Sequence, residues 1–232
     1  MSDALKGPRA TIAVLGGSGA EGGGLALRWA HAGHDVIIGS RNVEKAQEAA
    51  TRLSKAAGKP VAAMTNVDAA AKADIVVLAV PYSGQMATAK DIAPQLEGKI
   101  LIDVTVPLVP PKVARVQLPE GGSAVDALQK ALGAGVKVVS AFQNVSAHQL
   151  EHLGHPVNCD VLVCGDDEAS RERVVTLAHD GGMRAWQAGP LANSAAAEAL
   201  TSVLISINKR YKVENGAGIR ITGIDDKPAS SH

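Results

Sequence analysis

The sequence has few aromatic side chains, since phenylalanine, tyrosine and tryptophan together make up 2% of its 232 residues. A hydrophobic core must therefore be built from valine, isoleucine, leucine and alanine. The chain also has no excess of charge of one sign, because 23 basic residues balance 23 acidic ones. Without a basic block or aromatic rings on which bases could stack, we do not expect nucleic-acid binding.

The sequence also lacks the marks of membrane and exported proteins. No apolar run reaches the roughly 18 residues that a membrane-spanning helix needs, and residues 1–9 contain no apolar signal-peptide core. Cys159 and Cys164 do not have the spacing of metal ligands, and we interpret them as buried apolar residues in a reducing compartment. These absences predict a cytoplasmic protein that does not bind membranes.

A glycine-rich turn near the N-terminus carries the strongest functional signal. The apolar run at residues 12–15 ends at glycines, and a pattern rich in leucine and alanine follows. This order of strand, turn and helix is typical of a dinucleotide site. We expect Gly17 and Gly19 to let the backbone turn tightly and approach a pyrophosphate, and Gly22 to let the helix pack close to the strand. The N-terminus of that helix would offer unpaired N–H groups to the phosphates.

The end of the second predicted strand, residues 36–38, favours NADP over NAD. NAD-selective sites place a carboxylate there, whereas this chain has Ser40 and Arg41, with Lys45 one helical turn later. Each charge-assisted hydrogen bond to a phosphate is worth roughly 1.5–3 kcal/mol, so two would favour NADP by about a hundredfold or more. The alternative is that both cations are solvated, but a cation at a helix start is unfavourable unless an anion joins it.

Strand and helix patterns alternate along most of the chain, which predicts a Rossmann-type doubly wound parallel sheet of the α/β class. The predicted strands of this sheet cover residues 12–15, 36–38, 61–64, 74–80, 99–104 and 136–142, and the helices cover 20–32, 43–57, a short stretch after Asn66, 83–96 and 123–132. A smaller C-terminal α/β unit is predicted from helices at 147–153, 168–179 and 191–211 and strands at 160–164, 183–187 and 219–222.

The last predicted helix carries an apolar stripe formed by Leu200, Val203, Leu204 and Ile207. This spacing puts the four side chains on one helical face, which belongs either to the core or to a subunit interface. Periodicity does not distinguish the two.

The segments expected at the carboxyl ends of the strands contain no evident general acid or base apart from Asp103. Tyr82 and Tyr211 have no lysine four residues later, so a Tyr-x-x-x-Lys pair is absent. Enzymes that reduce a ketone normally position a proton donor. Hydride transfer between two redox cofactors depends mainly on holding two rings face to face, and the absence favours this second kind of chemistry.

Two polar clusters have better structural than metal-binding interpretations. His148, Glu151 and His152 match an H-x-x-E-H zinc pattern, but Gly154 and Pro156 follow within one turn and should end the helix. We interpret this segment as a solvated helix face. The acidic run at residues 166–168 directly precedes a predicted helix, where acidic side chains favour the helix dipole. We therefore expect no metal site.

The chain resembles the NADPH-dependent F420 reductases over residues 11 to about 224. The segments that carry the resemblance are Leu15-Gly16-Gly17-Ser18-Gly19, Gly39-Ser40-Arg41 with Lys45, Val80-Pro81-Tyr82, Val106-Pro107-Leu108-Val109-Pro110, Val139-Ser140-Ala141-Phe142, Val163-Cys164-Gly165-Asp166-Asp167 and Ala188-Gly189-Pro190-Leu191 with Asn193. The first two occur in many NADP enzymes, whereas the later ones are far less common in combination.

The resemblance implies hydride transfer between C4 of NADP(H) and C5 of the deazaflavin coenzyme F420, in a homodimer that acts on small molecules. It places the adenosine phosphates at residues 18–21, Ser40, Arg41 and Lys45, the nicotinamide at Val80 and Ala147 with Val109 nearby, and the deazaflavin near Ala217. The full set of expected cofactor-binding residues is Gly16, Gly17, Ser18, Gly19, Ala20, Glu21, Ser40, Arg41, Lys45, Val80, Pro81, Val109, Ala147 and Ala217.

The expected domains follow from the element pattern and the polar C-terminus, together with the small C-terminal domain that the resemblance implies. Residues 10–142 would form the NADP-binding domain. Residues 143–224 would form a smaller domain that completes the deazaflavin cleft and contributes a dimer contact. Residues 225–232 would be a disordered tail.

One position departs from the family pattern. Family members often have a histidine after the sixth strand, where this chain has Gln143. Glutamine can orient a bound ring through hydrogen bonds but cannot donate a proton as an imidazolium does, and we assign no other catalytic residue. Two alternatives stay open: an NADPH-dependent reductase of an imine or pterin that uses Gln143 or Asp103 for orientation, and a non-catalytic NADP-sensing protein.

Overall fold

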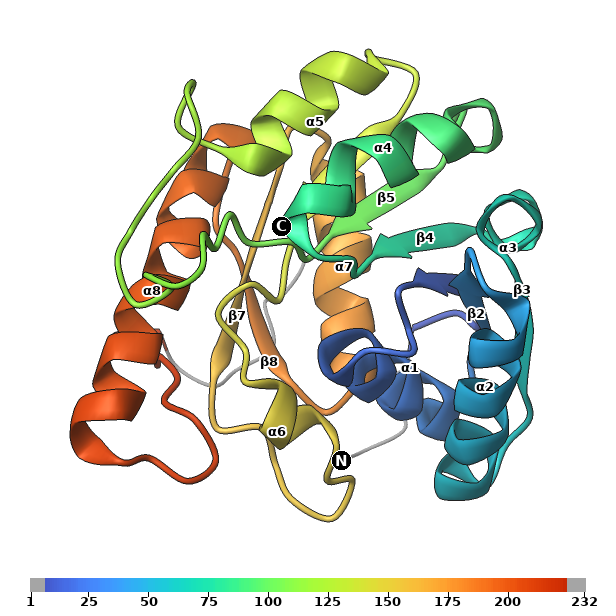
Figure 1. Ribbon diagram of the computed structural model, residues 1–232, viewed down its shortest axis with the longest axis horizontal. Coiled ribbons are helices and arrows are strands. Elements are labelled where there is room, and N and C mark those ends of the chain that lie inside the picture. Colours follow the sequence, from blue (N-terminus) through green and yellow to red (C-terminus); the bar gives the residue numbers. More distant parts are fainter. Residues whose placement is uncertain (1–6, 225–232) are drawn as a thin grey trace.

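The computed structural model describes residues 7–224, which form one eight-stranded sheet with helices on both faces (Figure 1). The strands are β1 (Thr11–Leu15), β2 (Asp35–Ser40), β3 (Val61–Thr65), β4 (Ile75–Leu78), β5 (Ile100–Asp103), β6 (Lys137–Ser140), β7 (Asp160–Gly165) and β8 (Arg184–Gln187). The helices are α1 (Ala20–Ala32), α2 (Val43–Ala57), α3 (Asn66–Lys72), α4 (Tyr82–Ile92), α5 (Ala124–Leu132), α6 (Ala147–Leu150), α7 (Glu168–Asp180) and α8 (Ser194–Tyr211), with 3-10 turns η2 (Ala93–Gln95) and η3 (Leu191–Asn193).

The strand order is β3-β2-β1-β4-β5-β6-β7-β8, and β1 to β6 run parallel. The predicted Rossmann-type α/β class is therefore confirmed. The sheet is mixed rather than fully parallel, because β7 pairs with β6 in the antiparallel sense through Ser140 and Cys164. The chain between these strands contains only the four-residue helix α6, which is too short to form a crossover to the opposite edge. The chain therefore enters β7 from the same edge of the sheet at which β6 ends.

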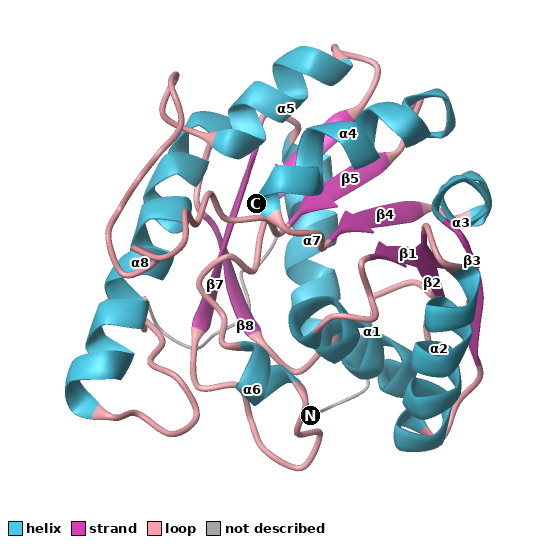
Figure 2. Cartoon of the chain, in the orientation of Figure 1, coloured by secondary structure: helices cyan, strands magenta, loops and turns pink. Residues whose placement is uncertain are grey.

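The central strands are apolar on both faces, as buried parallel strands should be. In β1, Ile12 and Val14 face the core shared with α1, α2 and α7, whereas Ala13 and Leu15 face the core shared with α3, α4 and α5. Figure 2 shows these two helical layers on either side of the strands. The core contains few aromatic rings. Those of Trp29 and Phe142 pack edge to face, with their ring centres 5.8 Å apart.

A buried arginine determines where α6 ends. The side chain of Arg28, on α1, donates hydrogen bonds to the backbone carbonyls of Leu150 (2.9 Å), Gln149 (2.8 Å), His152 (2.9 Å) and His155 (3.3 Å). It also reaches the carbonyl of Gly181 at 3.1 Å, in the turn between α7 and β8. Because these carbonyls point to the guanidinium, the helix predicted over 147–153 stops at Leu150.

The strand predicted at residues 219–222 is wrong, because this segment is not a strand in the structure. The segment does lie beside β7, where the N–H of Asp160 donates to the carbonyl of Ile219 at 2.8 Å. A strand would need a second backbone hydrogen bond to β7 from the N–H of Ile221. This N–H donates instead to the side-chain carboxylate of Asp160 at 2.8 Å. The predicted tail at residues 225–232 lies outside the described residues.

Asp160 holds this C-terminal segment in place. Its fully buried carboxylate accepts a two-pronged pair of hydrogen bonds from Arg184, both at 2.7 Å, and one from Trp186 at 2.8 Å. Burial alone would raise the pKa of Asp160, but the hydrogen bonds from Arg184, the Ile221 N–H and Trp186 outweigh it and lower the pKa to about 2. The ionised carboxylate therefore stabilises the fold.

We expect Arg28→Met to lower the free energy of unfolding by about 3–5 kcal/mol, because it leaves several buried carbonyls without a donor. Urea denaturation measures the change. Lys130→Met is the matched control, since it removes an exposed i,i+4 pair with Asp126 that is worth about 0.5 kcal/mol or less. Equal losses in the two variants would contradict the role given to Arg28.

We expect Asp160 to make the fold sensitive to acid. Its folded pKa lies below the unfolded value of about 3.9, so its contribution is complete above about pH 4 and is lost as the pH falls towards 2. A shift of about 2 units corresponds to about 2.5 kcal/mol. In urea titrations between pH 2 and 6, Asp160→Asn should be less stable at pH 6 and lose less stability on acidification. An unchanged acid dependence would rule the account out.

Candidate functional site

A cleft of about 230 Å³ opens at the carboxyl edge of the sheet, where the chain order reverses between β1 and β4. Ligands of doubly wound sheets bind in the crevice at this switch point. The residues that line the cleft are Gly16, Ser18, Ser40, Arg41, Asn66, Val80, Pro81, Ser83, Gly84 and Thr88. The structure thus brings together the glycine turn, the end of β2 and the two residues Val80 and Pro81 between β4 and α4, all of which the sequence predicted for the cofactor.

The glycine turn is shaped by close approach to β4. Gly16 has a φ of +88°, and a Cβ atom there would lie 2.3 Å from the carbonyl oxygen of Ala79. Within the turn the left-handed conformation therefore falls on Gly16, and the approach of Gly17 and Gly19 to a pyrophosphate stays a prediction. A Cβ on Gly22 would lie 2.9 Å from that of Ala79, so the expected close packing of helix and strand at Gly22 is confirmed.

The first turn of α1 has no side-chain cap, and Gly16 and Ser18 of the turn that leads into it line the cleft. Its N-cap is Gly19, which supplies no side-chain acceptor. By contrast, α2 and α3 are capped by the side chains of Asn42 and Thr65, and α5 and α7 by those of Ser123 and Asp167. The first N–H groups of a helix have no partner within it. Those of α1 are therefore available to an anion, which the helix dipole also favours.

Glu21 lies in this first turn and was expected from sequence only as part of the motif. Its Oε1 atom is buried and has no hydrogen-bond partner among the described residues. Burial raises the pKa of Glu21 to about 8. The side chain is therefore mostly neutral at pH 7 and does not repel an anion at the helix N-terminus.

Arg41 supplies the positive charge of the cleft. It is exposed, and in the part of the chain that the structure describes its guanidinium pairs with no carboxylate. Beside it, the Ser40 hydroxyl accepts a hydrogen bond from the Asn42 N–H at 3.0 Å. Lys45 does not line the cleft. It lies one turn along α2, where its backbone N–H donates to the Asn42 side chain at 2.9 Å.

The sequence reasoning missed Asn66 and the start of α4. The Oδ1 atom of Asn66 is buried without a partner, and a Cβ atom on Gly39 would lie 3.1 Å from it. Asn66 directly follows β3, as Ser40 ends β2, so the rule that strand ends meet at one edge could have found it. Ser83, Gly84 and Thr88 line the cleft because the first turns of α4 follow β4.

Ala147, Ala217 and Val109 do not line this cleft. The residues next to Ala147 and Ala217 are nevertheless close to each other, since a Cβ atom on Gly216 would lie 2.4 Å from the Ser146 hydroxyl. The backbone N–H of Ala217 donates to Asn208 at 2.6 Å. Val109 is 46% exposed and lies in the long segment after β5.

A second opening of about 640 Å³ lies near Ala147 and Ala217, between the segment after α6 and the segment after α8. Gln149 joins the two segments, because its side chain donates to the carbonyl of Gly216 at 2.9 Å and accepts from the N–H of Asn158 at 2.8 Å.

Gln143 is buried rather than exposed to the cleft. Its side chain is 2% exposed, and its amide donates to the backbone carbonyl of Asp103 at 2.8 Å. Its Oε1 atom has no partner among the described residues. The preceding residue, Phe142, has a φ of +73°, which is strained for a residue with a side chain. Packing of its ring against Trp29 holds the turn that brings Gln143 under the carboxyl edge.

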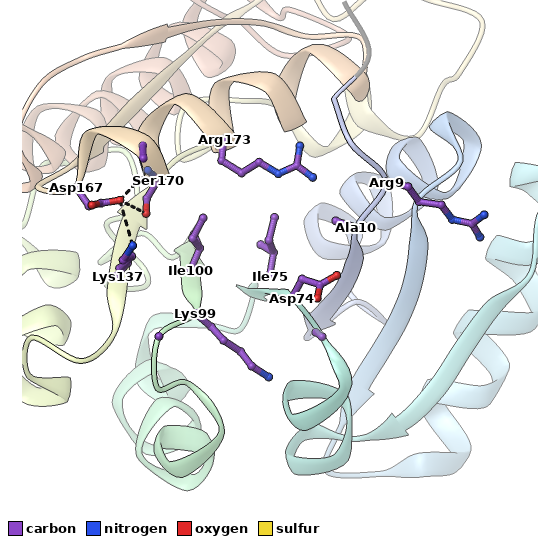
Figure 3. A pocket seen from close by; sticks show the side chains of 13 residues that line it. Arg9, Ala10, Asp74, Ile75, Lys99, Ile100, Lys137, Asp167, Ser170 and Arg173 are labelled. Atoms are coloured by element: carbon purple, nitrogen blue, oxygen red, sulfur yellow. Dashed lines mark hydrogen bonds and ion pairs between the residues drawn. The ribbon is translucent and has the colours of Figure 1, made fainter.

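A third opening, of about 500 Å³, lies at the opposite edge, where β1, β4, β5 and β6 begin (Figure 3). Several of its charged groups already have partners. Lys137 pairs with Asp167 at 3.7 Å, Lys99 donates to the carbonyl of Ala70 at 2.8 Å, and Asp74 accepts from the N–H of Thr11 at 2.8 Å. Its place at the amino ends of the strands also sets it apart from the edge where ligands of this fold bind.

The histidine motif does not converge. His148 lies on α6, whereas His152 lies beyond its end and faces His155 with ring centres 6.5 Å apart. Among residues 7–224, no three His, Cys, Asp or Glu side chains are grouped as metal ligands. Within the same range, no helix is both long and apolar enough to cross a membrane.

Comparison with known proteins decides the family. Residues 11–107 match the model of the family described as NADP oxidoreductase, coenzyme F420-dependent. F420-dependent NADP reductases from Methanocaldococcus jannaschii and Methanothermobacter thermautotrophicus are 42% and 44% identical to this chain, over 92% and 93% of it and 99% and 96% of their own lengths. The chain belongs to the F420-dependent NADP reductases.

A solved structure agrees with this membership. A protein from Arthrobacter sp. FB24, described as an F420-dependent NADP reductase, superposes with a TM-score of 0.75 at 26% identity. The match covers 89% of this chain and 96% of the other. The fold of this F420-dependent NADP reductase family member is therefore shared almost from end to end.

Proposed function

We propose that this protein transfers a hydride between C4 of NADP(H) and C5 of coenzyme F420. One observation carries the proposal: the glycine turn that leads into the uncapped N-terminus of α1 lines the same cleft as Arg41, whose guanidinium pairs with no carboxylate among residues 7–224. One can bind a pyrophosphate and the other a 2′-phosphate. The relatives that cover nearly the whole chain are named for this pair of cofactors.

The cleft has the properties that NADP(H) needs. The turn allows close backbone approach, and the buried Oδ1 atom of Asn66 is an acceptor that has no partner among residues 7–224. We assign the phosphates to Gly16, Gly17, Ser18, Gly19, Ala20, Glu21, Ser40, Arg41 and Lys45, and the nicotinamide end to Val80, Pro81, Val109 and Ala147.

We assign the deazaflavin to a cleft completed by residues 143–224, which we propose as a smaller domain beside an NADP-binding domain at 10–142. Ala217 would lie near the deazaflavin. Two observations support this assignment. The segment after α8 is anchored to the Asp160 carboxylate through the Ile221 N–H, and it meets the start of α6 at Gly216. Both contacts hold the two walls at a fixed separation.

The proposed hydride transfer needs no strong acid or base among the side chains. NADPH supplies the hydride and F420 accepts it at C5. This chain binds both molecules, keeps their rings face to face and excludes water, which accounts for much of the rate of such a transfer. Gln143 stays the residue that we propose for orientation, and because it is buried and bonded to the Asp103 carbonyl it would act by fixing the segment that leads into α6.

We also propose that the protein is a cytoplasmic homodimer. The apolar stripe predicted on the last helix divides in the structure. Leu204 is buried, whereas Val203 and Ile207 are 44% and 37% exposed, and Tyr211 continues the outer row at 72%. The segment after β5 reaches α8 at its end, where the Ser123 hydroxyl donates to Glu198 at 2.6 Å, and within this segment Val116 is 43% exposed. Such a surface is typical of a subunit contact. Sedimentation velocity should give twice the mass of the chain, and a monomer at micromolar concentration would refute this assignment.

An anaerobic assay tests the function. Purified protein is mixed with NADPH and F420, and the absorbance of the oxidised deazaflavin is followed, with NADH as the control donor. We expect rapid loss with NADPH and little with NADH. NADPH binding with no loss would contradict the proposal and favour a different acceptor, such as an imine or pterin, or a sensing role.

We expect Arg41→Ala to raise the KM for NADPH by about tenfold to a hundredfold, because it removes a charge-assisted hydrogen bond worth roughly 1.5–3 kcal/mol. The KM for NADH should change little. Steady-state kinetics with both donors measures the split. Arg9→Ala, an exposed arginine at the opposite edge, is the control and should leave both values unchanged. Equal effects of Arg41→Ala on the two donors would remove the 2′-phosphate assignment.

A further inference from the structure

A buried carboxylate lies beneath the carboxyl edge and is not used in the function described so far. Asp103 is the last residue of β5 and is 0% exposed. In the sheet it pairs with Leu78 at the end of β4 and with Ser140 at the end of β6. It therefore lies at the point where three neighbouring strands open into the segments that surround the crevice.

Asp103 is bonded to each of these three segments. Its carboxylate accepts hydrogen bonds from the Gln85 side chain on α4 and from the N–H of Thr105 at 2.9 Å. Its backbone carbonyl accepts from the Gln143 side chain at 2.8 Å and from the N–H of Ala141 at 3.3 Å. Gln85 also donates to the Thr105 hydroxyl at 2.8 Å, which closes the network between the segments after β4 and β5.

The segments joined in this way carry residues assigned to the cofactor. Gln85 lies on α4 between Gly84 and Thr88, and both of these residues line the cleft. Thr105 leads into the segment of Val109, and Gln143 into the start of α6. A small movement of the Asp103 carboxylate would therefore change the spacing of the segments after β4 and β5, relative to the segment after β6 that the backbone carbonyl of the same residue holds.

The ionised form of Asp103 suits these bonds. Burial raises its pKa to about 6, while the bonds from Thr105 and Gln85 act in the opposite direction and the negative charge of Glu198, on α8, raises it further. The groups that contact it from α4 and pair with it in β6 are Gln85 and Ser140, which are uncharged. Protonation would place an O–H against a donor, either the Gln85 amide or the Thr105 N–H, and weaken the network.

We propose that Asp103 is a positioning residue for hydride transfer: it fixes the segments after β4, β5 and β6 in the arrangement that brings the nicotinamide and the acceptor ring together. The inference rests on the proposed function. A merely structural carboxylate would affect stability but not the rate of transfer in the folded protein.

The test is Asp103→Asn, which keeps the size of the side chain but presents an amide to Gln85. In single-turnover reduction of F420 by NADPH we expect the rate to fall on the order of tenfold or more, since small displacements of reacting groups are costly. The Kd for NADPH should stay within about twofold, because the turn after β1 and Arg41 are untouched. Loss of affinity in place of rate would overturn the inference.

The pH dependence supplies a second readout. Ionised Asp103 is the competent form, so the wild-type rate should fall as the pH decreases through about 6, and the rate of Asp103→Asn should lack this step. A wild-type rate and an unchanged acid limb in Asp103→Asn would also refute the inference.

Two glutamine variants separate positioning from stability. Gln85→Met removes a partner of Asp103, and Gln129→Met is the matched control. Gln129 also ties its helix to a strand, through the Val136 carbonyl and the Val138 N–H, both at 3.0 Å, but at the amino edge. We expect only Gln85→Met to slow the transfer, and equal slowing would contradict the inference. If the wild type itself does not reduce F420, the proposed function fails instead.

Discussion

One buried guanidinium sets the relation between the two sides of the site. Arg28 lies on α1, the same helix whose first turn is open for phosphate, and it holds the carbonyls that end α6. A Cβ atom on Gly24 would lie 2.5 Å from that of Leu150, so the two helices are in direct contact. Because both contacts are made by α1, they set the separation between its N-terminus and the start of α6 at Ala147. That separation is what a reaction between two bound rings requires.

Among residues 7–224, most buried side-chain polar atoms without a partner lie near the carboxyl edge of the sheet, whereas those of Gln95 and Arg173 lie elsewhere. The Oδ1 atom of Asn66 and the Oε1 atom of Glu21 lie near the cleft, and the Ser140 hydroxyl and Gln143 Oε1 lie at the end of β6. Buried polar groups in proteins usually have partners. Their concentration at one edge fits a surface whose remaining hydrogen bonds come from bound molecules, and it fits a chain that orients its substrates without a strong acid or base.

The parts of the fold and site that the sequence predicted correctly rest on local rules. The strand, glycine turn and helix around Gly16 follow from backbone sterics, and Ser40 and Arg41 lie in the same cleft because parallel strands end at one edge. Asn66 was not predicted to line the cleft, although it follows the end of β3 and the same rule applies to it.

The errors come from long-range contacts that periodicity does not record. The reversal of β7 depends on how little helix lies between residues 140 and 160, and the early end of α6 depends on Arg28, which lies more than a hundred residues earlier. The strand expected at residues 219–222 is absent because the Asp160 carboxylate takes a backbone N–H that a ladder would have used.

Direct transfer between the two rings is the central claim, and isotopic labelling tests it. NADPH carrying deuterium on each face of C4 in turn would be reacted with F420 in water, and the reduced deazaflavin examined by mass spectrometry. Our account predicts that deuterium from one face arrives at C5, because the walls of the cleft hold the rings in one orientation. Deuterium lost to water, or transferred equally from both faces, would contradict it.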